Sequence, residues 1–373
     1  MKKKILVACN DPGGTMACVP VIKRLLEDRK IDTVIYAGKY AQDIFSRESV
    51  PFKTLAYNCI NREKLKHIEN ILEKEKPIIV FTSTSFGKVV DNVFSYVAIR
   101  KGIKTFVLID QWCNYSKRFR IYDNNKNFEN LPDYIGVIDN IAKQEMIEER
   151  FPPERLVVVG HPYFDSLINQ KRELSKQQKK SFRDSYVIGN KNIIVTFASA
   201  PFKRGEYQKI GYTDIIIIKK LVKALSSIAH KYNRHITLII KTHPRDERKD
   251  SAFPVNSDEL IKVMLVRADN ATDFILNSDI VTGMDSIFLV ESFLLGKPTL
   301  SVQIGLKTED ALITNRMGLT KAILSYDELN VVLKDIIVEK SWHKYVGKNS
   351  QFLKMNYKST ERTMSLIEKI INS

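Results

Sequence analysis

The sequence contains no run of about 20 apolar residues, so no segment of it predicts a membrane-spanning helix. The chain begins with Met1-Lys2-Lys3-Lys4, and the apolar run that follows, Ile5–Cys9, is too short for a signal peptide. That run instead predicts a first β-strand. We therefore expect a cytoplasmic protein.

Cysteine is scarce as well, with four residues in 373 and neither CxxC nor zinc-ligand spacing among them. Buried, reduced thiols are the simplest interpretation for a cytoplasmic chain. No pair of aspartates occurs as Asp-x-Asp, and no His/Cys cluster has metal spacing. The sequence thus favours a metal-independent mechanism without a resident cofactor.

Acidic residues are outnumbered, with 43 Asp and Glu against 59 Lys and Arg, a formal net charge of +16. This surplus favours anionic partners such as nucleotides, acidic glycans or the negative inner leaflet, and it suggests a peripheral contact with the inner membrane. A lysine-rich genome composition is the open alternative. Nucleic acid is not an expected partner, because the basic residues are scattered and belong to no recognition motif.

Short apolar strands alternate with helical patterns along most of the chain, which is typical of α/β proteins with doubly wound parallel sheets. The expected strands are Ile5–Ala8, Thr33–Tyr36, Ile78–Thr82, Thr105–Ile109, Tyr134–Ile138, Leu156–Val159, Ile193–Phe197, Ile236–Ile240, Lys262–Val266, Ile280–Val281 and Thr299–Val302. A chain of this length exceeds one hydrophobic core. We expect two Rossmann-like domains facing a cleft, over 1–170 and 191–340, a crossover over 171–190, and a helical tail over 341–373 that packs back on the first domain.

The tetrapeptide Lys241-Thr242-His243-Pro244 directly follows the apolar run Ile236–Ile240. Open α/β sheets bind ligands at the carboxyl ends of their strands, so Lys241 and His243 are candidates for holding a phosphate. Pro244 fixes the backbone after the histidine and suits the first position of a helix. The alternative is a solvated lysine and a histidine that caps the chain locally.

A second motif, Gly283-Met284-Asp285-Ser286, precedes an apolar helical pattern that contains Glu291 and ends in Gly296-Lys297-Pro298. Ser286 suits the N-cap and Asp285 lies beside the positive end of that helix, whose free N–H groups can bind a phosphate. A carboxylate among apolar residues is costly unless it is paired, and two ribose hydroxyls would satisfy Glu291. An ion pair with a Lys or Arg from another element is the alternative.

These two motifs resemble the carboxyl-terminal domain of glycosyltransferases with the B-type, two-Rossmann fold. The chain is similar in particular to bacterial sialyltransferases, Kdo transferases and CDP-glycerol glycerophosphotransferases. In those families a His-Pro motif and a downstream Ser motif hold a cytidine nucleotide, and the matching positions here are His243-Pro244 and Asp285-Ser286. The segment Val157–Asp165 also resembles the end of the amino-terminal domain in this fold.

The first domain is expected to bind the acceptor. Gly13 and Gly14 follow the first strand, in a loop that resembles the acceptor-side loop of B-fold transferases but lacks GxGxxG. Asp11 and Asp110 are alternative general bases, and either can instead cap the adjacent helix. Trp112, in the aromatic loop after Asp110, is suited to stacking on a sugar. The sequence Asp110-Gln111-Trp112 departs from the carboxylate motif of the cytidine-donor families.

Two further donor contacts are Ser199 and Arg204, which follow the strand Ile193–Phe197. Together these residues predict a glycosyltransferase that moves a sugar or polyol phosphate from a CMP- or CDP-linked donor to a surface-glycan precursor, as in capsule or cell-envelope polysaccharide synthesis. A UDP-sugar 2-epimerase-like enzyme is the alternative with the same fold. A non-catalytic nucleotide- or glycan-binding subunit is the alternative from another class.

Overall fold

The computed structural model describes residues 2–55, 61–119, 131–169, 174–200, 206–243, 246–267, 270–347, 352 and 358–372. The chain forms two compact units. The first comprises residues 1–169 and 351–373, and the second comprises residues 170–350. The segment expected as a crossover therefore clusters with the second unit, and the segment expected as a tail is divided between the two.

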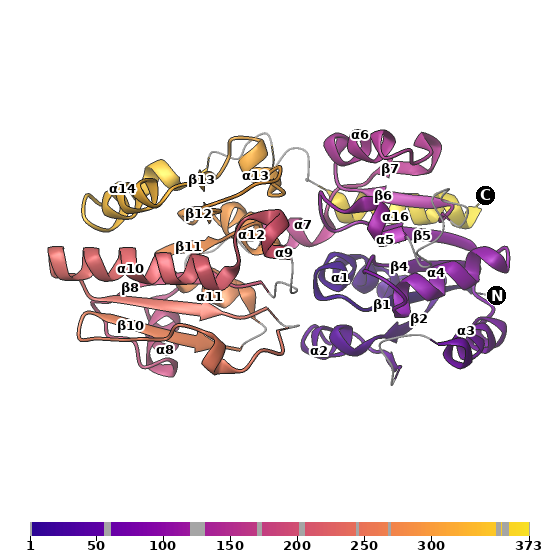
Figure 1. Cartoon of the computed structure of the whole chain (residues 1–373). Coiled ribbons are helices and arrows are strands. Elements are labelled where there is room, and N and C mark those ends of the chain that lie inside the picture. The colour runs from indigo at the N-terminus through magenta and orange to yellow at the C-terminus, as the bar shows by residue number, and fades with distance from the viewer. Residues whose placement is uncertain are drawn as a thin grey trace. The chain divides into compact units, whose positions relative to one another are not determined.

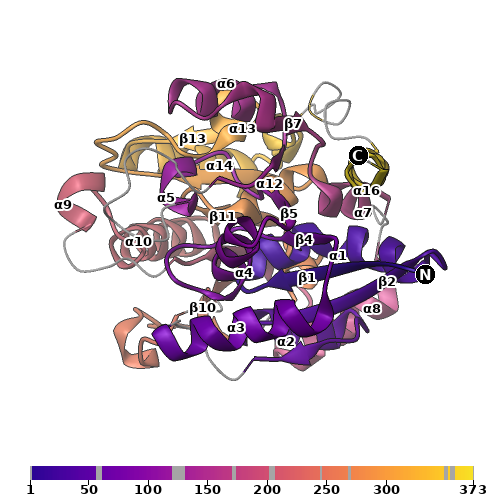
Figure 2. The same ribbon diagram turned by 90° about the vertical axis from the view of Figure 1, so that its right-hand side faces the viewer.

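The first unit is built on a seven-stranded sheet in the order β3-β2-β1-β4-β5-β6-β7, whose paired strands are all parallel (Figures 1 and 2). Its strands are β1 (Lys3–Cys9), β2 (Ile31–Ala37), β3 (Lys53–Thr54), β4 (Ile79–Thr82), β5 (Lys104–Leu108), β6 (Tyr134–Val137) and β7 (Leu156–Val158). Its α-helices are α1 (Pro12–Glu27), α2 (Lys39–Arg47), α3 (Arg62–Glu75), α4 (Val90–Arg100), α5 (Tyr115–Phe119), α6 (Asn140–Glu148), α7 (Pro162–Asn169) and α16 (Ser359–Asn372), with a 3-10 turn η1 (Pro153–Arg155).

Helices cover both faces of this sheet, which is why β1 is a continuous apolar run. Ile5 and Val7 pack against α1, α2 and α16 on one face, while Leu6 and Ala8 pack against α3 and α4 on the other. Figure 1 shows α16, in yellow, among the indigo and purple elements of this unit. Helix α16, the last described helix of the chain, is therefore part of the same hydrophobic core as β1, the first strand.

The second unit is built on a six-stranded parallel sheet in the order β10-β9-β8-β11-β12-β13. Its strands are β8 (Ile193–Ala198), β9 (Ile236–Lys241), β10 (Ile261–Val266), β11 (Ile280–Gly283), β12 (Thr299–Val302) and β13 (Lys321–Ile323). Its helices are α8 (Lys176–Ser185), α9 (Glu206–Ile210), α10 (Asp214–Tyr232), α11 (Ala271–Asn277), α12 (Ile287–Leu294), α13 (Ile313–Arg316) and α14 (Tyr326–Ile337), with 3-10 turns η2 (Asp250–Ala252) and η3 (Trp342–Tyr345).

The structure confirms the predicted α/β class and its two doubly wound parallel sheets. No helix in the described part of the chain is both long enough and apolar enough to cross a membrane. In each unit the strands end at one edge of the sheet, and the loops that leave this edge carry the candidate site residues.

Candidate functional site

In the second unit, the candidate residues gather where β8, β9 and β11 end. Lys241 is the last residue of β9 and is buried, and its carbonyl accepts a hydrogen bond from the amide of Ser199 at 2.9 Å. The side chains of Lys241 and Phe288 also meet, with Nζ 5.9 Å from the ring centroid. These residues therefore lie together at one edge of the second sheet.

Glu291 lies in the middle of α12 and is only 7% exposed. Its Oε2 atom has no hydrogen-bond partner among the described residues. Burial raises the pKa of the Glu291 carboxyl to about 7, although the charge of Lys241 acts in the opposite direction. A buried carboxylate with an unused acceptor is costly in the isolated protein, and a ligand hydroxyl would remove that cost.

The hydroxyl of Ser199 is a second buried polar group without a partner within the described part of the chain. Ser199 comes immediately after β8, and the neighbouring β11 ends at Gly283, beside the carbonyl of Ala198. The sheet edge thus presents an unpaired hydroxyl, an unpaired carboxylate oxygen and a buried lysine within one unit. Their chemistry suits a ligand that carries both hydroxyls and negative charge.

Ser286 is the N-cap of α12, as predicted, and its Oγ accepts a hydrogen bond from the amide of Phe288 at 3.3 Å. Asp285 is exposed beside it. The Gly296-Lys297-Pro298 segment has a structural role, because Lys297 Nζ donates to the carbonyls of Leu276 and Ser278 at the end of α11. Pro244 and Arg204, which we also predicted as donor contacts, lie outside the described residues.

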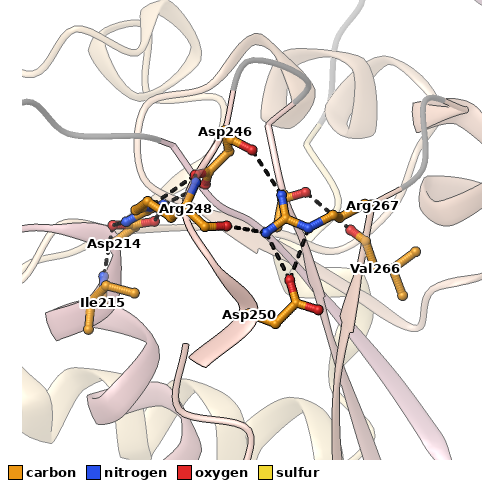
Figure 3. Close-up of polar contacts among 8 residues, drawn as sticks. Asp214, Ile215, Asp246, Arg248, Asp250, Val266 and Arg267 are labelled. Carbon is orange, nitrogen blue, oxygen red and sulfur yellow. Dashed lines mark hydrogen bonds and ion pairs between the residues drawn. The ribbon is translucent and has the colours of Figure 1, made fainter. Parts of the chain in front are cut away.

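Residues 246–250 are held by a cluster of ion pairs (Figure 3). Arg248 contacts the buried carboxylates of both Asp214, in the first turn of α10, and Asp246, with a distance of 2.6 Å from Nη2 to each. The amide of Asp246 in turn donates to the carbonyl of His243 at 2.8 Å. Sequence reasoning missed this cluster, since Asp214 lies more than 30 residues before Asp246 and Arg248.

In the first unit, Asp110 follows β5 and is buried in a polar cluster. Its Oδ1 accepts a hydrogen bond from Arg118 Nη1 at 2.9 Å and another from Thr84 Oγ1 at 3.3 Å. Arg118 and Thr84 were not predicted as site residues, because the sequence shows only that one is basic and that the other carries a hydroxyl. A Cβ on Gly13 would meet Asp110 Oδ2 at 2.6 Å, so this glycine permits the carboxylate to approach the start of α1.

A second buried carboxylate, Asp91 in the first turn of α4, contacts the β4–α4 loop. It accepts hydrogen bonds from Ser83 Oγ at 2.8 Å and Ser85 Oγ at 2.6 Å. Burial raises the pKa of the Asp91 carboxyl to about 7, and the charge of Asp11 acts in the same direction. No group of three or more metal-ligating side chains is assembled in the described ranges of the chain.

The other predicted residues of the first unit lie at the start of α1 and after β5. Asp11 occupies the N-cap position of α1 without a side-chain capping bond. Gly13 and Gly14 lie within the first turn of α1 rather than in a loop, because Pro12 already begins that helix. The structure corrects the role expected for Trp112. Its ring is buried between Phe164 and Phe352 and its Nε1 donates to Asp139 Oδ2 at 2.7 Å, so it presents no face for stacking on a sugar.

The fold is that of two-Rossmann, glycosyltransferase B-type proteins. The solved structures that it resembles include Staphylococcus aureus MnaA with UDP (TM-score 0.73, 14% identity, 99% of this chain and 97% of that one). UDP-GlcNAc 2-epimerase from Neisseria meningitidis, bound to UDP-GlcNAc, gives a TM-score of 0.72 at 14% identity over 99% of this chain and 100% of that one. A glycosyltransferase from Rickettsia africae gives 0.64 at 15% identity over 99% of each chain.

Comparison of the sequence with protein-family profiles and with curated proteins finds no match. The structural likenesses correct one expectation of the sequence analysis. The prediction of a transferase with a CMP- or CDP-linked donor, similar to sialyltransferases and Kdo transferases, is wrong, because UDP-GlcNAc 2-epimerases recur among the similar structures. The alternative stated with it, an enzyme of UDP-sugars, agrees better with these findings.

Proposed function

We propose that the protein binds a UDP-linked N-acetylhexosamine and inverts its C2 centre, as a UDP-GlcNAc 2-epimerase does. One observation carries the proposal: Glu291 and Ser199 keep unpaired, buried oxygens beside Lys241 at the carboxyl edge of the second sheet. The similar solved structures include complexes with UDP and with UDP-GlcNAc, which supports a uridine nucleotide as the ligand.

The binding roles follow from the chemistry of each group. We assign the two ribose hydroxyls to Glu291, because a carboxylate accepts both and burial makes the pairing favourable. We assign the diphosphate to Lys241, His243 and the N-terminus of α12 at Ser286, because a basic side chain, an imidazole N–H and the positive end of a helix all attract anions. Ser199 would donate its hydroxyl to the same ligand.

Inversion at C2 requires a base that removes the C2 proton, and the electron pair of the C2–H bond then forms a C1–C2 double bond while the C1–O bond to UDP breaks. An acid delivers a proton to the other face of C2 as UDP adds back to C1, which restores the UDP-linked sugar with C2 inverted. We assign one of these roles to Asp110, whose carboxylate is oriented by Arg118 and Thr84. Asp11, also at the carboxyl edge of the first sheet, is the second candidate. Because these carboxyls exchange protons with water, the product formed in deuterium oxide would carry deuterium at C2.

The test is incubation of the purified protein with UDP-GlcNAc in deuterium oxide, followed by proton NMR. We expect the C2 epimer to appear without any acceptor and with deuterium at C2. Asp110→Asn should abolish this conversion while it retains UDP binding, and Glu291→Gln should weaken UDP binding. Exposed residues supply matched controls, Asp43→Asn and Glu368→Gln, which should behave like the wild type.

UDP binding itself is measured by thermal denaturation. At a hundred times its dissociation constant, UDP should stabilise the folded state by about 2.7 kcal/mol. UDP binding without conversion of UDP-GlcNAc, unchanged in Asp110→Asn, would point instead to the non-catalytic binding subunit. The absence of any UDP effect on the wild type would contradict the nucleotide site altogether.

A further inference from the structure

A chain of buried hydrogen bonds crosses the second unit from α10 to the turn that precedes α12. The hydroxyl of Tyr212, just before α10, lies 3.0 Å from Gln303 Oε1. Gln303 Nε2 lies 2.9 Å from Ser301 Oγ, and Ser301 Oγ lies 2.5 Å from the carbonyl oxygen of Met284. Met284 directly precedes Asp285 and Ser286, so the chain ends at the turn assigned to the diphosphate.

The direction of each bond in this chain is fixed. A carbonyl oxygen only accepts and the Gln303 amide nitrogen only donates, so Ser301 must donate to Met284 and accept from Gln303. The second N–H of the Gln303 amide donates to Asp310 Oδ1 at 2.9 Å. Gln303 and Ser301 are fully buried, at 0% exposure. Neither water nor an alternative rotamer can replace a lost member of such a network at low cost.

The loop after β12 is also locked to the segment before α10. Gly211 and Gly305 both adopt positive φ, +99° and +101°, and a Cβ on Gly211 would lie 1.9 Å from the carbonyl oxygen of Gly305. The amide of Lys307 donates to the carbonyl of Ile210 at 2.9 Å. Only glycine permits two backbones to approach in this way. Gln303 therefore begins one of two segments that are fixed to each other, and its side chain joins Tyr212 of the other segment to Ser301 and, through it, to Met284.

We propose that Gln303 is a positioning residue that acts through Ser301 to hold the Met284–Ser286 turn, and that it thereby sets the affinity of the second unit for the diphosphate of UDP. This inference rests on the UDP site proposed above. Ser286 supplies the side-chain cap that α12 has at its start, and the Met284 carbonyl anchors the turn from the other side. Loss of this anchor would let the N-terminus of α12 move away from the phosphates.

The first experiment measures UDP affinity by calorimetry in Gln303→Met, which keeps the side-chain length but removes both polar groups, and in Ser301→Ala. We expect UDP to bind about tenfold more weakly in each. The double variant should be no weaker than either single variant, since both remove the same link. Asn315→Ala is the matched control, because Asn315 donates to the other oxygen of Asp310, at 2.8 Å, and its loss leaves the bonds of Gln303 to Ser301 and of Ser301 to Met284 in place.

Thermal denaturation of all variants shows whether a loss of UDP affinity is distinct from a loss of folding stability. The control should lose stability and keep wild-type affinity. If Gln303→Met and Ser301→Ala lose stability but bind UDP within twofold of the wild type, Gln303 has a structural role alone and the proposal is overturned.

The second experiment needs no ligand. The amides of Phe288 and Leu289 bond to the side chain and the carbonyl of Ser286, so their hydrogen exchange reports directly on the turn. Exchange at these amides should be faster in Gln303→Met and Ser301→Ala than in the wild type or in Asn315→Ala. Unchanged exchange would overturn the positioning role. If the wild type binds no UDP, the proposed function fails, and the exchange rates still decide whether Gln303 holds the turn.

Discussion

Glu291 links the folding of the second unit to proton binding. Its carboxyl titrates near 4.5 in the unfolded chain, whereas burial raises its pKa in the folded chain to about 7. Between these values the folded state holds a proton that the unfolded state has released. The contribution of Glu291 to stability therefore falls as the pH rises through this window.

We accordingly expect Glu291→Gln to be more stable than the wild type at pH 8, by up to about 3 kcal/mol. The difference should shrink as the pH falls towards 4, where both states of the wild type are protonated. Urea denaturation at several pH values measures it. A pH-independent difference between the two proteins would contradict the raised pKa of this group.

The sequence revealed those site residues whose chemistry conflicts with their surroundings. Glu291 was predictable because a lone carboxylate stood in an apolar helix, and Lys241 because it ended an apolar strand. Arg118 was not predictable, since an arginine in a polar stretch is usually exposed and its partner Asp110 is identified only by the fold. Trp112 was misjudged because its buried partners, Phe164 and Phe352, are distant in sequence.

At the scale of elements, the strands that sequence analysis located are mostly apolar runs, as expected where helices cover the faces of a parallel sheet. The strands β3 and β13 were not predicted. They are edge strands of two and three residues, each begins with an exposed lysine, and neither is long enough to show a pattern. Their positions are determined by pairing with β2 and β12, which no local property of the sequence encodes.

The first turn of α1 contacts the β4–α4 loop closely. A Cβ on Gly14 would lie 2.8 Å from the Cβ of Ser83 and 3.2 Å from the carbonyl oxygen of Thr84. Alanine is more favourable than glycine in a helix by about 1 kcal/mol. This gain is outweighed here, because neither the Ser83 side chain nor the Thr84 carbonyl can move away easily from an added Cβ. Gly14→Ala should therefore destabilise the protein by roughly 2 kcal/mol in urea denaturation. An increase in stability would show that helix propensity outweighs the contact.

Arg248 joins α10 to the loop after β9, and burial alone would raise the pKa of Asp246. Hydrogen bonds from Arg248 outweigh burial and lower that pKa instead. Arg248→Gln leaves Asp214 and Asp246 buried without a cation, at a cost of roughly 3 kcal/mol at pH 7. Because the buried Asp246 carboxyl loses the partner that lowers its pKa and then binds a proton more readily in the folded state, this deficit should narrow as the pH falls towards 4.

Chemical denaturation of Arg248→Gln at pH 7 and pH 4.5 measures this effect. Arg24→Gln is the control, since the carboxylate that Arg24 contacts, Glu27, has a side chain 68% exposed. The control should lose less stability and show little pH dependence. Equal deficits at both pH values would argue against charge burial as the cause.

At the scale of the whole molecule, the first unit is discontinuous in sequence. Leu366, Ile367 and Ile370 of α16 are buried in the same core as Ile5 and Val7 of β1. Ile367 is fully buried, so Ile367→Ala should cost about 2–5 kcal/mol in the stability of this unit. Ser365, exposed on the same helix, provides the control Ser365→Ala.

Tryptophan fluorescence makes that prediction specific to one unit. Of the two tryptophans, Trp112 is buried in the first unit, whereas Trp342 is 55% exposed in the second. The change in emission on unfolding should therefore come mainly from Trp112. Its midpoint should shift in Ile367→Ala and not in Ser365→Ala, and an unshifted midpoint would show that α16 is dispensable for this core.

The return of α16 to the first core has a consequence for biosynthesis. Residues 170–350 are complete before α16 leaves the ribosome, so the second unit has all its strands and helices available while the first still lacks a helix over one face of its sheet. On a nascent chain, the first unit, whose synthesis begins first, is therefore the last that can finish folding. Until then the apolar face beneath α16 is a surface for chaperones to protect.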